Sequence, residues 1–369
     1  METRPYVSWE QIGSFMRSAF EACGIPKDDA AICADVLMES DRRGIESHGC
    51  NRFKPIYIDR IRAGILLPVT EIEVLKETPT TMVTDAHDGM GMVTSYHMME
   101  KLIEKAKTYG LAMGAIRNSS HYGIAGYWVT MATKKGMIGM TGTNARPSIA
   151  PTFGVENMLG TNPLTIGLPT DEEFPFVLDC ATSITQRGKI EYFARNGKDT
   201  PAGMVIGKNG EALTDSEQIL VDLTQGTAAL APLGGINDDL AGYKGYGYAT
   251  VVEVLSAALQ SGSYLKMLTG FDENGNRRPY HLGHWFLVVD PDAFMGQDAF
   301  KKTCGEILRA LRASEKAPGR DRIYTAGEKE YLCWLDRKDK GVPVNEGVQK
   351  DLTTVRDWYN LPFKFDFEK

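Results

Sequence analysis

The sequence has no excess of basic residues and no long apolar run. Its 369 residues carry 41 lysines and arginines against 48 aspartates and glutamates, a net charge of −7. An acidic balance without a basic arm disfavours a general nucleic-acid-binding protein. The longest apolar runs, such as residues 285–289, have the length of a strand and fall far short of a membrane span. We therefore expect a protein that binds neither nucleic acid nor membrane.

Cysteine pairs are also missing. Six cysteines are scattered along the chain, and none forms a CxxC motif. This pattern predicts reduced thiols and not a disulfide framework or a zinc site. The first residues lack the charged and then apolar segments of a secretory signal, so we expect a cytoplasmic protein. A chain of this length is expected to form two or three structural parts.

The glycine fingerprints of nucleotide-binding proteins are absent. Neither GxGxxG nor GxxxxGK[ST] occurs. The nearest run, GMGMVT at 89–94, lacks the third glycine and an evident helix start. These fingerprints hold phosphates at a helix N-terminus. Taken alone, the glycine fingerprints therefore identify no cofactor.

The residue pattern divides the chain into helical ends and a mixed middle. Ser8 and Gln11 form a capping box ahead of a helix that is expected to end near Gly24. Because strands and helices do not alternate strictly, a doubly wound parallel sheet is disfavoured, and residues 200–239 are expected to be turn-rich. The expected strands cover 71–75, 81–84, 111–116, 137–143, 164–168, 176–178 and 285–289, and the expected later helices 50–63, 95–109, about 245–261, 297–312 and a tail from 344.

The segment ESHGCNR, residues 46–52, has the residues for acid–base chemistry. Histidine titrates near neutral pH, so His48 could give or take a proton. Ser47 could orient the ring, and Arg52 could bind a carboxylate through two parallel hydrogen bonds. In a helix His48 and Arg52 would share one face, although Pro55 requires a first turn or a kink. The alternative is a helix cap at Ser47 with two ordinary surface residues.

A second histidine, His121, lies in the polar run NSSHYG at 118–123, directly after a strand-like stretch. Loops at strand ends frequently carry functional residues. The same run could equally be a turn whose polar side chains bond to the local backbone. The chain has only six histidines and two stand in Ser-His contexts, which favours a functional role for both.

Three weaker patterns remain. GYKGYG at 242–247 leads into a helix, and its glycines together with Lys244 could hold a phosphate; a flexible loop is the alternative. The segment VLDCATS at 177–183 is a strand that ends in a small polar turn. His281 and His284 have the spacing of metal ligands, but no nearby cysteine or carboxylate pair completes a site, so no metal is expected.

Together these segments resemble the malate/L-lactate dehydrogenase family of the second type, which is unrelated to the Rossmann lactate and malate dehydrogenases. The matching stretches spread over most of the chain in the same order. Two positions depart from the family pattern: Ala145 stands where serine is frequent, and Ala-Gly-Glu at 326–328 where Pro-Gly-Glu is frequent. The matching stretches are ESHGCNRFKPIYIDRIRAG, RNSSHYGIAGYW, MLGTNPLTIGLPT, FVLDCATS followed by RGKI, and PLGG followed by GYKGYG.

The resemblance implies an α+β homodimer that is not Rossmann, with a mostly antiparallel or mixed sheet in the cofactor part. It implies a helical part from residues 1–78 joined by 297–369. A mixed α/β part would comprise 79–125 and 245–296. The nicotinamide cofactor, NAD or NADP, would be bound by residues 126–244.

The resemblance also implies roles for individual residues. His48, His121 and Ser47 match catalytic positions, and Arg52 matches a substrate-binding position. Either histidine could move the proton. The residues that match cofactor-binding segments are Asp179, Cys180, Ala181, Thr182, Ser183, Lys244, Gly245, Gly327 and Glu328.

The implied activity is hydride transfer between a nicotinamide and a small 2-hydroxy acid or its 2-keto acid. Malate and oxaloacetate are the first expected pair, and lactate and pyruvate the second. Three alternatives remain: an imine or other keto-acid reductase on the same scaffold, a cofactor-binding sensor without turnover, and a zinc hydrolase that uses His281 and His284.

Overall fold

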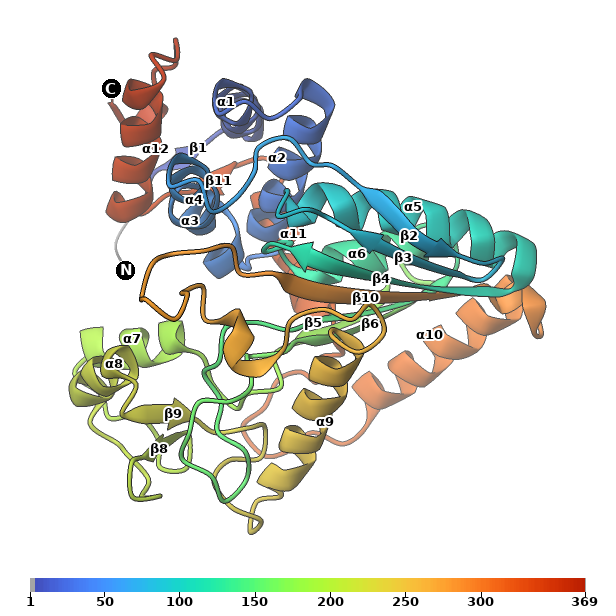
Figure 1. The fold of residues 1–369 in the computed structure, drawn as a ribbon. Coiled ribbons are helices and arrows are strands. Elements are labelled where there is room, and N and C mark those ends of the chain that lie inside the picture. Colours follow the sequence, from blue (N-terminus) through green and yellow to red (C-terminus); the bar gives the residue numbers. More distant parts are fainter. Residues whose placement is uncertain (1–3, 369) are drawn as a thin grey trace.

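A seven-stranded sheet forms the centre of the computed structural model, which describes residues 4–368 (Figure 1). Neighbouring strands are antiparallel except β3 and β4, which are parallel. The mixed sheet that the sequence predicts is therefore confirmed. The strands, in their order across the sheet, are β2 (Glu73–Glu77), β3 (Thr81–Asp85), β4 (Leu111–Ser119), β10 (Leu282–Val289), β5 (Ile138–Thr143), β6 (Leu164–Leu168) and β7 (Phe176–Cys180).

Helices cover both faces of this sheet. Helices α5 (Gly91–Tyr109) and α6 (Ala125–Thr133) lie over one face, and α9 (Gly242–Leu255) lies against the other (Figure 1). Helix α5 begins at Gly91, so the run 89–94 does open a helix, contrary to the expectation from the sequence.

Two glycines allow α6 to approach the sheet closely. Gly139 of β5 and Gly167 of β6 are register partners. A Cβ atom on Gly139 would lie 2.9 Å from the Cα atom of Val129 in α6, and one on Gly167 would lie 2.9 Å from the Val129 side chain. Only glycine fits at this separation, because real Cβ atoms do not come so near to other heavy atoms.

Both ends of the chain form a helical layer beside the sheet (Figure 1). The Ser8 hydroxyl accepts the Gln11 N–H at 3.2 Å, so the expected helix cap is confirmed. Phe15 packs edge-on against Phe53 and Phe365, which joins the two chain ends in one core. The elements of this layer are β1 (Tyr6–Val7), α1 (Trp9–Ala22), α2 (Lys27–Arg42), η1 (Glu46–His48), α3 (Cys50–Arg52), the π-helix η2 (Phe53–Ile58), α4 (Asp59–Arg62), α11 (Glu328–Arg337), β11 (Val342–Pro343), α12 (Glu346–Trp358) and η5 (Asp366–Glu368).

A smaller unit with its own apolar core lies below the sheet in Figure 1. Residues 200–239 are rich in turns, as expected, but they also hold a helix and two paired strands that the sequence analysis did not predict. Asp215 caps the helix by accepting two backbone N–H groups, and Gly226 ends it in the left-handed region, so these turn-forming residues mark its ends. The elements of the unit are α7 (Arg187–Arg195), β8 (Val205–Gly207), α8 (Ser216–Gln225) and β9 (Ala228–Leu230).

The last long helix, α10 (Gln297–Ala313), lies along the sheet, where its apolar side faces Ile138, Leu168 and Val289. No helix within residues 4–368 is long and apolar enough to cross a membrane. Two short helices complete the fold, η3 (Leu265–Leu268) and η4 (Pro291–Ala293).

Candidate active site

The fold brings the two predicted catalytic histidines together. His48 ends the short helix η1, and His121 lies in the loop after β4. Their rings stack with centroids 5.7 Å apart and an angle of 21° between the planes. A stacked pair of imidazoles places two proton-carrying groups beside one small volume, which is the arrangement that acid–base chemistry requires.

The local backbone around His48 differs from the expected helix. Gly49 separates η1 from α3, so His48 and Arg52 are not one turn apart on a continuous helix, and that expectation is wrong. A Cβ atom on Gly49 would lie 2.1 Å from the carboxylate of Asp41, which accepts the Cys50 N–H at 2.9 Å. The Arg52 side chain nevertheless lies near His48, because its Nε donates to the carbonyl of the preceding residue, Ser47, at 2.7 Å.

A π-helix replaces the middle of the helix expected over 50–63. Pro55 lies within it, at a position where an α-helix would lose a hydrogen bond and meet a clash. Wider π turns accommodate such a residue and are frequent at functional sites. The buried Tyr57 follows two residues later, and its hydroxyl lies 2.6 Å from Nδ1 of His121.

The contacts of His121 determine its tautomer. The Gly123 backbone N–H donates to Nδ1 at 3.2 Å, and the Tyr57 hydroxyl is the second group at this atom. A backbone N–H can only donate, so Nδ1 carries no hydrogen and the neutral ring carries its proton on Nε2. Within the described part of the chain Nε2 has no hydrogen-bond partner and is available to a ligand.

His48 is held differently. Its Nδ1 lies 2.9 Å from the hydroxyl of Ser47, and a hydroxyl can donate or accept. His48 can therefore adopt either neutral tautomer, and as an imidazolium it would donate from Nδ1 to Ser47. Among residues 4–368 the Nε2 atom of each ring has no hydrogen-bond partner, which leaves both available to a substrate. Only His48 can gain a proton without losing its hydrogen bond at Nδ1.

Neither ring has a carboxylate partner among residues 4–368. Burial lowers the pKa of His48 to about 4, and the charge of Arg52 acts in the same direction. Burial also lowers the pKa of His121, with further contributions from His48 and the nearby arginines. Both imidazoles are therefore neutral at pH 7. A bound anion would offset the arginine charges and make protonation easier.

The segment predicted to contact the cofactor contains buried polar atoms that suit a ligand. The Ser183 hydroxyl is buried and finds no partner within the described part of the chain, and neither does that of Thr185, which the sequence analysis missed. The Thr182 hydroxyl is already bonded to backbone carbonyl groups. At the end of β7 the Cys180 thiol donates to the Leu164 carbonyl oxygen at 3.9 Å, and Ala181, which follows, has no polar side chain. A buried hydroxyl without a partner is costly, so a polar group of a bound molecule is the expected partner.

Asp179 has an evident structural task. One carboxylate oxygen accepts the Gly126 N–H at the start of α6 at 2.7 Å, and the other accepts the Thr165 hydroxyl at 3.0 Å. Burial raises its pKa. Both oxygens are therefore engaged within the chain, and Asp179 anchors α6 to the sheet.

The glycines before α9 also have a packing reason. A Cβ atom on Gly242 would lie 2.0 Å from the Gly235 carbonyl oxygen, and one on Gly245 would lie 2.1 Å from that of Leu233. These two glycines face the chain's own loop and not an open anion site. Lys244 is exposed, with its Nζ 5.9 Å from the Tyr243 ring centroid.

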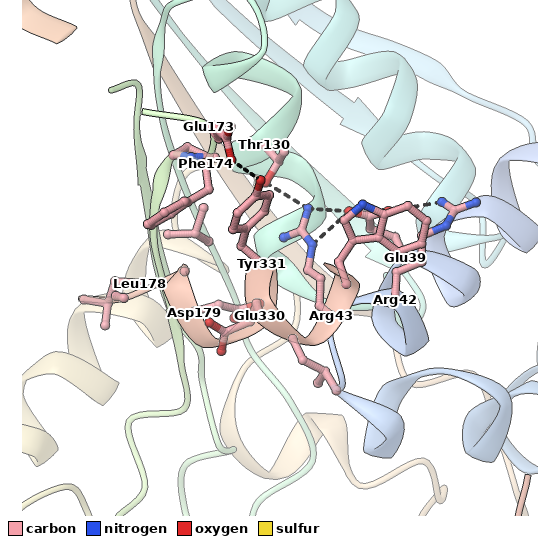
Figure 2. Close-up of a pocket in the computed structure, with 16 residues that line it drawn as sticks. Glu39, Arg42, Arg43, Thr130, Glu173, Phe174, Leu178, Asp179, Glu330 and Tyr331 are labelled. Carbon is pink, nitrogen blue, oxygen red and sulfur yellow. Dashed lines mark hydrogen bonds and ion pairs between the residues drawn. The ribbon is translucent and has the colours of Figure 1, made fainter. Parts of the chain in front are cut away.

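Gly327 and Glu328 lie at the start of α11. Glu328 accepts the Thr325 N–H at 3.1 Å and pairs with Arg322, so it fixes the loop that leads into this helix. Gly327 lines a cavity of about 550 Å³ between α2, β7 and α11, together with Asp179. Neither active-site histidine lines this cavity. Figure 2 shows its polar wall, where the Arg43 guanidinium bonds to side chains of α2 and α6.

The remaining candidate pair does not form a metal site. His284 is fully buried, stacks on Tyr122 with centroids 4.5 Å apart, and bonds to Thr143. His281 instead pairs with Asp88 at 2.8 Å. Within the described residues no group of three or more His, Cys, Asp or Glu could hold a metal ion.

Sequence reasoning missed Tyr57 and its neighbour Arg60, whose charge acts on His121. Pro55 within a helical pattern was the available signal for an unusual backbone here. No local signal marked Tyr280, whose ring lies under the Arg60 guanidinium at 4.3 Å, because the two residues belong to distant segments.

The chain is similar to known proteins over nearly its whole length. Residues 7–353 match the family described as malate/L-lactate dehydrogenase. The chain is 38% identical to a malate dehydrogenase from Pyrococcus horikoshii over 94% of this chain and 93% of that protein. It is 36% identical to an L-sulfolactate dehydrogenase from Methanocaldococcus jannaschii, over 90% and 91%. The crystal structure of a malate dehydrogenase from Entamoeba histolytica superposes with a TM-score of 0.94 at 39% identity, covering 98% of this chain and all of that one.

Proposed function

The chain belongs to the malate/L-lactate dehydrogenase family, and on that premise we propose that it interconverts malate and oxaloacetate with NAD or NADP. It is an oxidoreductase of small 2-hydroxy acids, and lactate with pyruvate is the second candidate pair. The relatives named above are hydroxy-acid dehydrogenases, so an imine reductase and a sensor without turnover are not favoured.

The residues at hand suit a nicotinamide cofactor. We propose that the partnerless hydroxyls of Ser183 and Thr185, the backbone at Cys180 and Ala181, and Lys244 hold it, with Gly327 at the edge of the neighbouring cavity. Asp179, Gly245 and Glu328 would support these segments through their internal contacts. When bound, the nicotinamide supplies or accepts the hydride at C2 of the substrate.

The arrangement of the two histidines supports separate roles. Arg52 would bind the C1 carboxylate of the substrate, and its bond to the Ser47 carbonyl holds it beside His48. His121 would donate a hydrogen bond from Nε2 to the substrate oxygen and so favour negative charge on that oxygen. His48 would move the proton, because Ser47 can accept from the imidazolium that results. The Gly123 N–H opposes the same change at His121.

The observation that carries this proposal is the different partner at each Nδ1, and glutamine substitutions test it. Glutamine keeps an N–H donor but cannot carry a proton at neutral pH. His48→Gln should lower kcat by roughly 10²–10⁴-fold. His121→Gln should lose tenfold or less, whereas His121→Ala, without a donor, should lose on the order of a hundredfold. Steady-state oxaloacetate reduction and malate oxidation measure these effects.

His97 on α5 provides the matched control. It is half-exposed and paired with Glu100, so His97→Gln should keep wild-type turnover. If His121→Gln were as damaging as His48→Gln, the two roles would be assigned wrongly. Near-wild-type turnover in all of these variants would remove the histidine pair from the active site.

The remaining predictions from the resemblance stay proposals. We propose a homodimer, which is supported by half-exposed apolar side chains along α9, among them Tyr248, Val251 and Val254. The division into a helical part, a mixed part and a cofactor part at 126–244 rests on the resemblance. The proposed cytoplasmic location rests instead on the absence of cysteine pairs from the sequence. The preference for NAD or NADP is to be measured with each reduced cofactor.

A further inference from the structure

Two arginines, Arg52 and Arg60, lie near the histidine pair, and a third, Arg146, lies near Arg60. Within residues 4–368, Arg52, Arg60 and Arg146 form no ion pair with an aspartate or glutamate. Three other arginines of the helical layer behave differently, since Arg42, Arg43 and Arg337 each lie within 3.1 Å of a carboxylate oxygen. Arginine stays charged in proteins. A cluster of uncompensated guanidinium groups is therefore the signature of an anion-binding site.

Arg60 is the member of this cluster that its surroundings hold most firmly. Its guanidinium lies over the Tyr280 ring at 4.3 Å, and Gly270 leaves room for that ring, since an added Cβ would come within 2.7 Å of it. Arg60 follows Tyr57 by three residues, so the two side chains are neighbours along the helical segment. Tyr57 in turn contacts His121 at 2.6 Å. A short chain of contacts thus connects Arg60 to the reacting centre.

Electrostatics support the same placement. Burial lowers the pKa of Arg60, and the charges of Arg146 and Arg52 lower it further. The charge of Arg60 also lowers the pKa of His121. These mutual repulsions destabilise the protein until an anion enters. A substrate with one carboxylate would compensate only Arg52, whereas a second anionic group would compensate Arg60.

We infer that Arg60, assisted by Arg146, binds the distal anionic group of a dianionic 2-hydroxy or 2-keto acid, and thereby selects dianions over monoanionic acids. Arg52 takes the C1 carboxylate, so the two acid groups of the substrate lie on either side of the histidine pair. The distal group can be a carboxylate or a sulfonate, because both accept hydrogen bonds from a guanidinium. This inference rests on the proposed function, and it assigns the specificity of that site.

The test compares Arg60→Gln with the wild type on three keto acids and each reduced cofactor. Oxaloacetate carries a distal carboxylate, sulfopyruvate a distal sulfonate, and pyruvate neither. Arg60→Gln should lower kcat/KM for the preferred dianion by on the order of a hundredfold. The kcat/KM for pyruvate should change by less than about threefold. The ratio of kcat/KM for the dianion to kcat/KM for pyruvate should therefore fall sharply. Arg60→Lys should recover part of it, because a lysine keeps the charge without the planar fork.

Arg62→Gln is the matched control. Arg62 is exposed on the same short helix, but its guanidinium lies over the Trp358 ring of α12 at 4.1 Å, so its removal should leave the ratio unchanged. Because the ratio is measured within one protein sample, partial unfolding of a variant cannot change it.

The outcomes separate the two claims. A wild type that reduces no 2-keto acid with either cofactor would overturn the proposed function. A wild type that reduces pyruvate as well as both dianions, or an Arg60→Gln variant that loses all three activities equally, would overturn the inference about Arg60 and leave the proposed function in place. The preferred dianion, oxaloacetate or sulfopyruvate, identifies the distal group.

Discussion

The hydrogen-bond partners at Nδ1 distinguish the two candidate catalytic histidines. At His121 a backbone N–H and the Tyr57 hydroxyl meet at Nδ1, and this assigns the ring's proton to Nε2. At His48 the partner is the Ser47 hydroxyl, which can reverse its role. Two neighbouring histidines therefore differ in chemistry: the proton of neutral His121 is fixed on Nε2, whereas His48 can adopt either tautomer.

The pKa of His48 predicts how malate oxidation depends on pH in the acid range. In the proposed mechanism, oxidation needs a neutral His48 to accept the proton, so activity should be lost when this ring is protonated. Burial lowers the pKa of His48 to about 4, so the neutral form persists well below the usual value of 6.5. We expect kcat/KM for oxidation, measured at constant ionic strength, to keep its value down to about pH 5.

Malate's own carboxyl ionisation is corrected for by repeating the profile with lactate. An acid limb centred near pH 6.5 with both substrates would contradict the lowered pKa. In His48→Gln the residual kcat/KM should show no decrease at acid pH that is due to protonation of residue 48.

Among the elements, the segment from η1 to α4 contributes most to the site. It changes from a 3-10 turn to an α turn, a π-helix and again an α turn between residues 46 and 62. Pro55 explains why a regular α-helix is not maintained. The irregular backbone carries Ser47, His48, Arg52 and Arg60, which are the residues assigned to substrate binding and proton transfer.

Helix α6 offers a test of element packing. Gly139→Ala would bring a Cβ atom within 2.9 Å of the Val129 Cα, and backbone atoms cannot move aside cheaply. We expect a loss of about 1–3 kcal/mol in the free energy of unfolding. Gly247→Ala on α9 is the control, because its Cβ would meet no atom within 4 Å. Its free energy of unfolding should rise by up to about 1 kcal/mol. Urea denaturation measures both, and equal effects of the same sign would refute the packing argument.

Considering the whole molecule, the helical layer depends on a buried carboxyl group. Asp41 lies at the end of α2 and accepts the Cys50 N–H, and the Arg337 side chain from near the C-terminus bonds to its carbonyl. Burial raises the pKa of Asp41 from 3.8 to about 7. Segments from both ends of the chain therefore meet at one titratable group.

Asp41 should make global stability depend on pH. Between about pH 4 and 7 the folded protein retains a proton that the unfolded chain has released, so this contribution to stability falls as pH rises through that window. Asp41→Asn keeps the acceptor for the Cys50 N–H and removes the titration. Relative to the wild type, the variant should gain up to about 1.4 kcal/mol per pH unit across the window.

Urea unfolding of both proteins at pH 5 and pH 8 measures this difference. The buried histidines make stability rise with pH, but they are present in both proteins, so their contribution cancels in the comparison. A wild type that gains stability relative to Asp41→Asn between pH 5 and 8 would contradict the raised pKa.

The sequence alone was sufficient for most of the strands, for the long helices and for the family. Ser8 marks a helix start through a contact three residues away, and strand periodicity repeats every second residue, so both signals are local. Helix α6 was missed because it is buried on most sides and has no polar face to set a period. The motifs around His48 and His121 pointed to acid–base residues and to the family, although no rule of spacing related one to the other.

Only the tertiary structure decided how these residues act together. The stacking of His48 on His121, the proton on Nε2 of His121, and the position of Arg60 over Tyr280 all depend on contacts between distant segments. It also showed that Gly245 and Asp179, whose motifs suggested ligand binding, pack against their own chain. The reason is physical: helix caps and periodicity act within a few residues, whereas the electrostatics and hydrogen bonds of a site depend on which surfaces meet when the core forms.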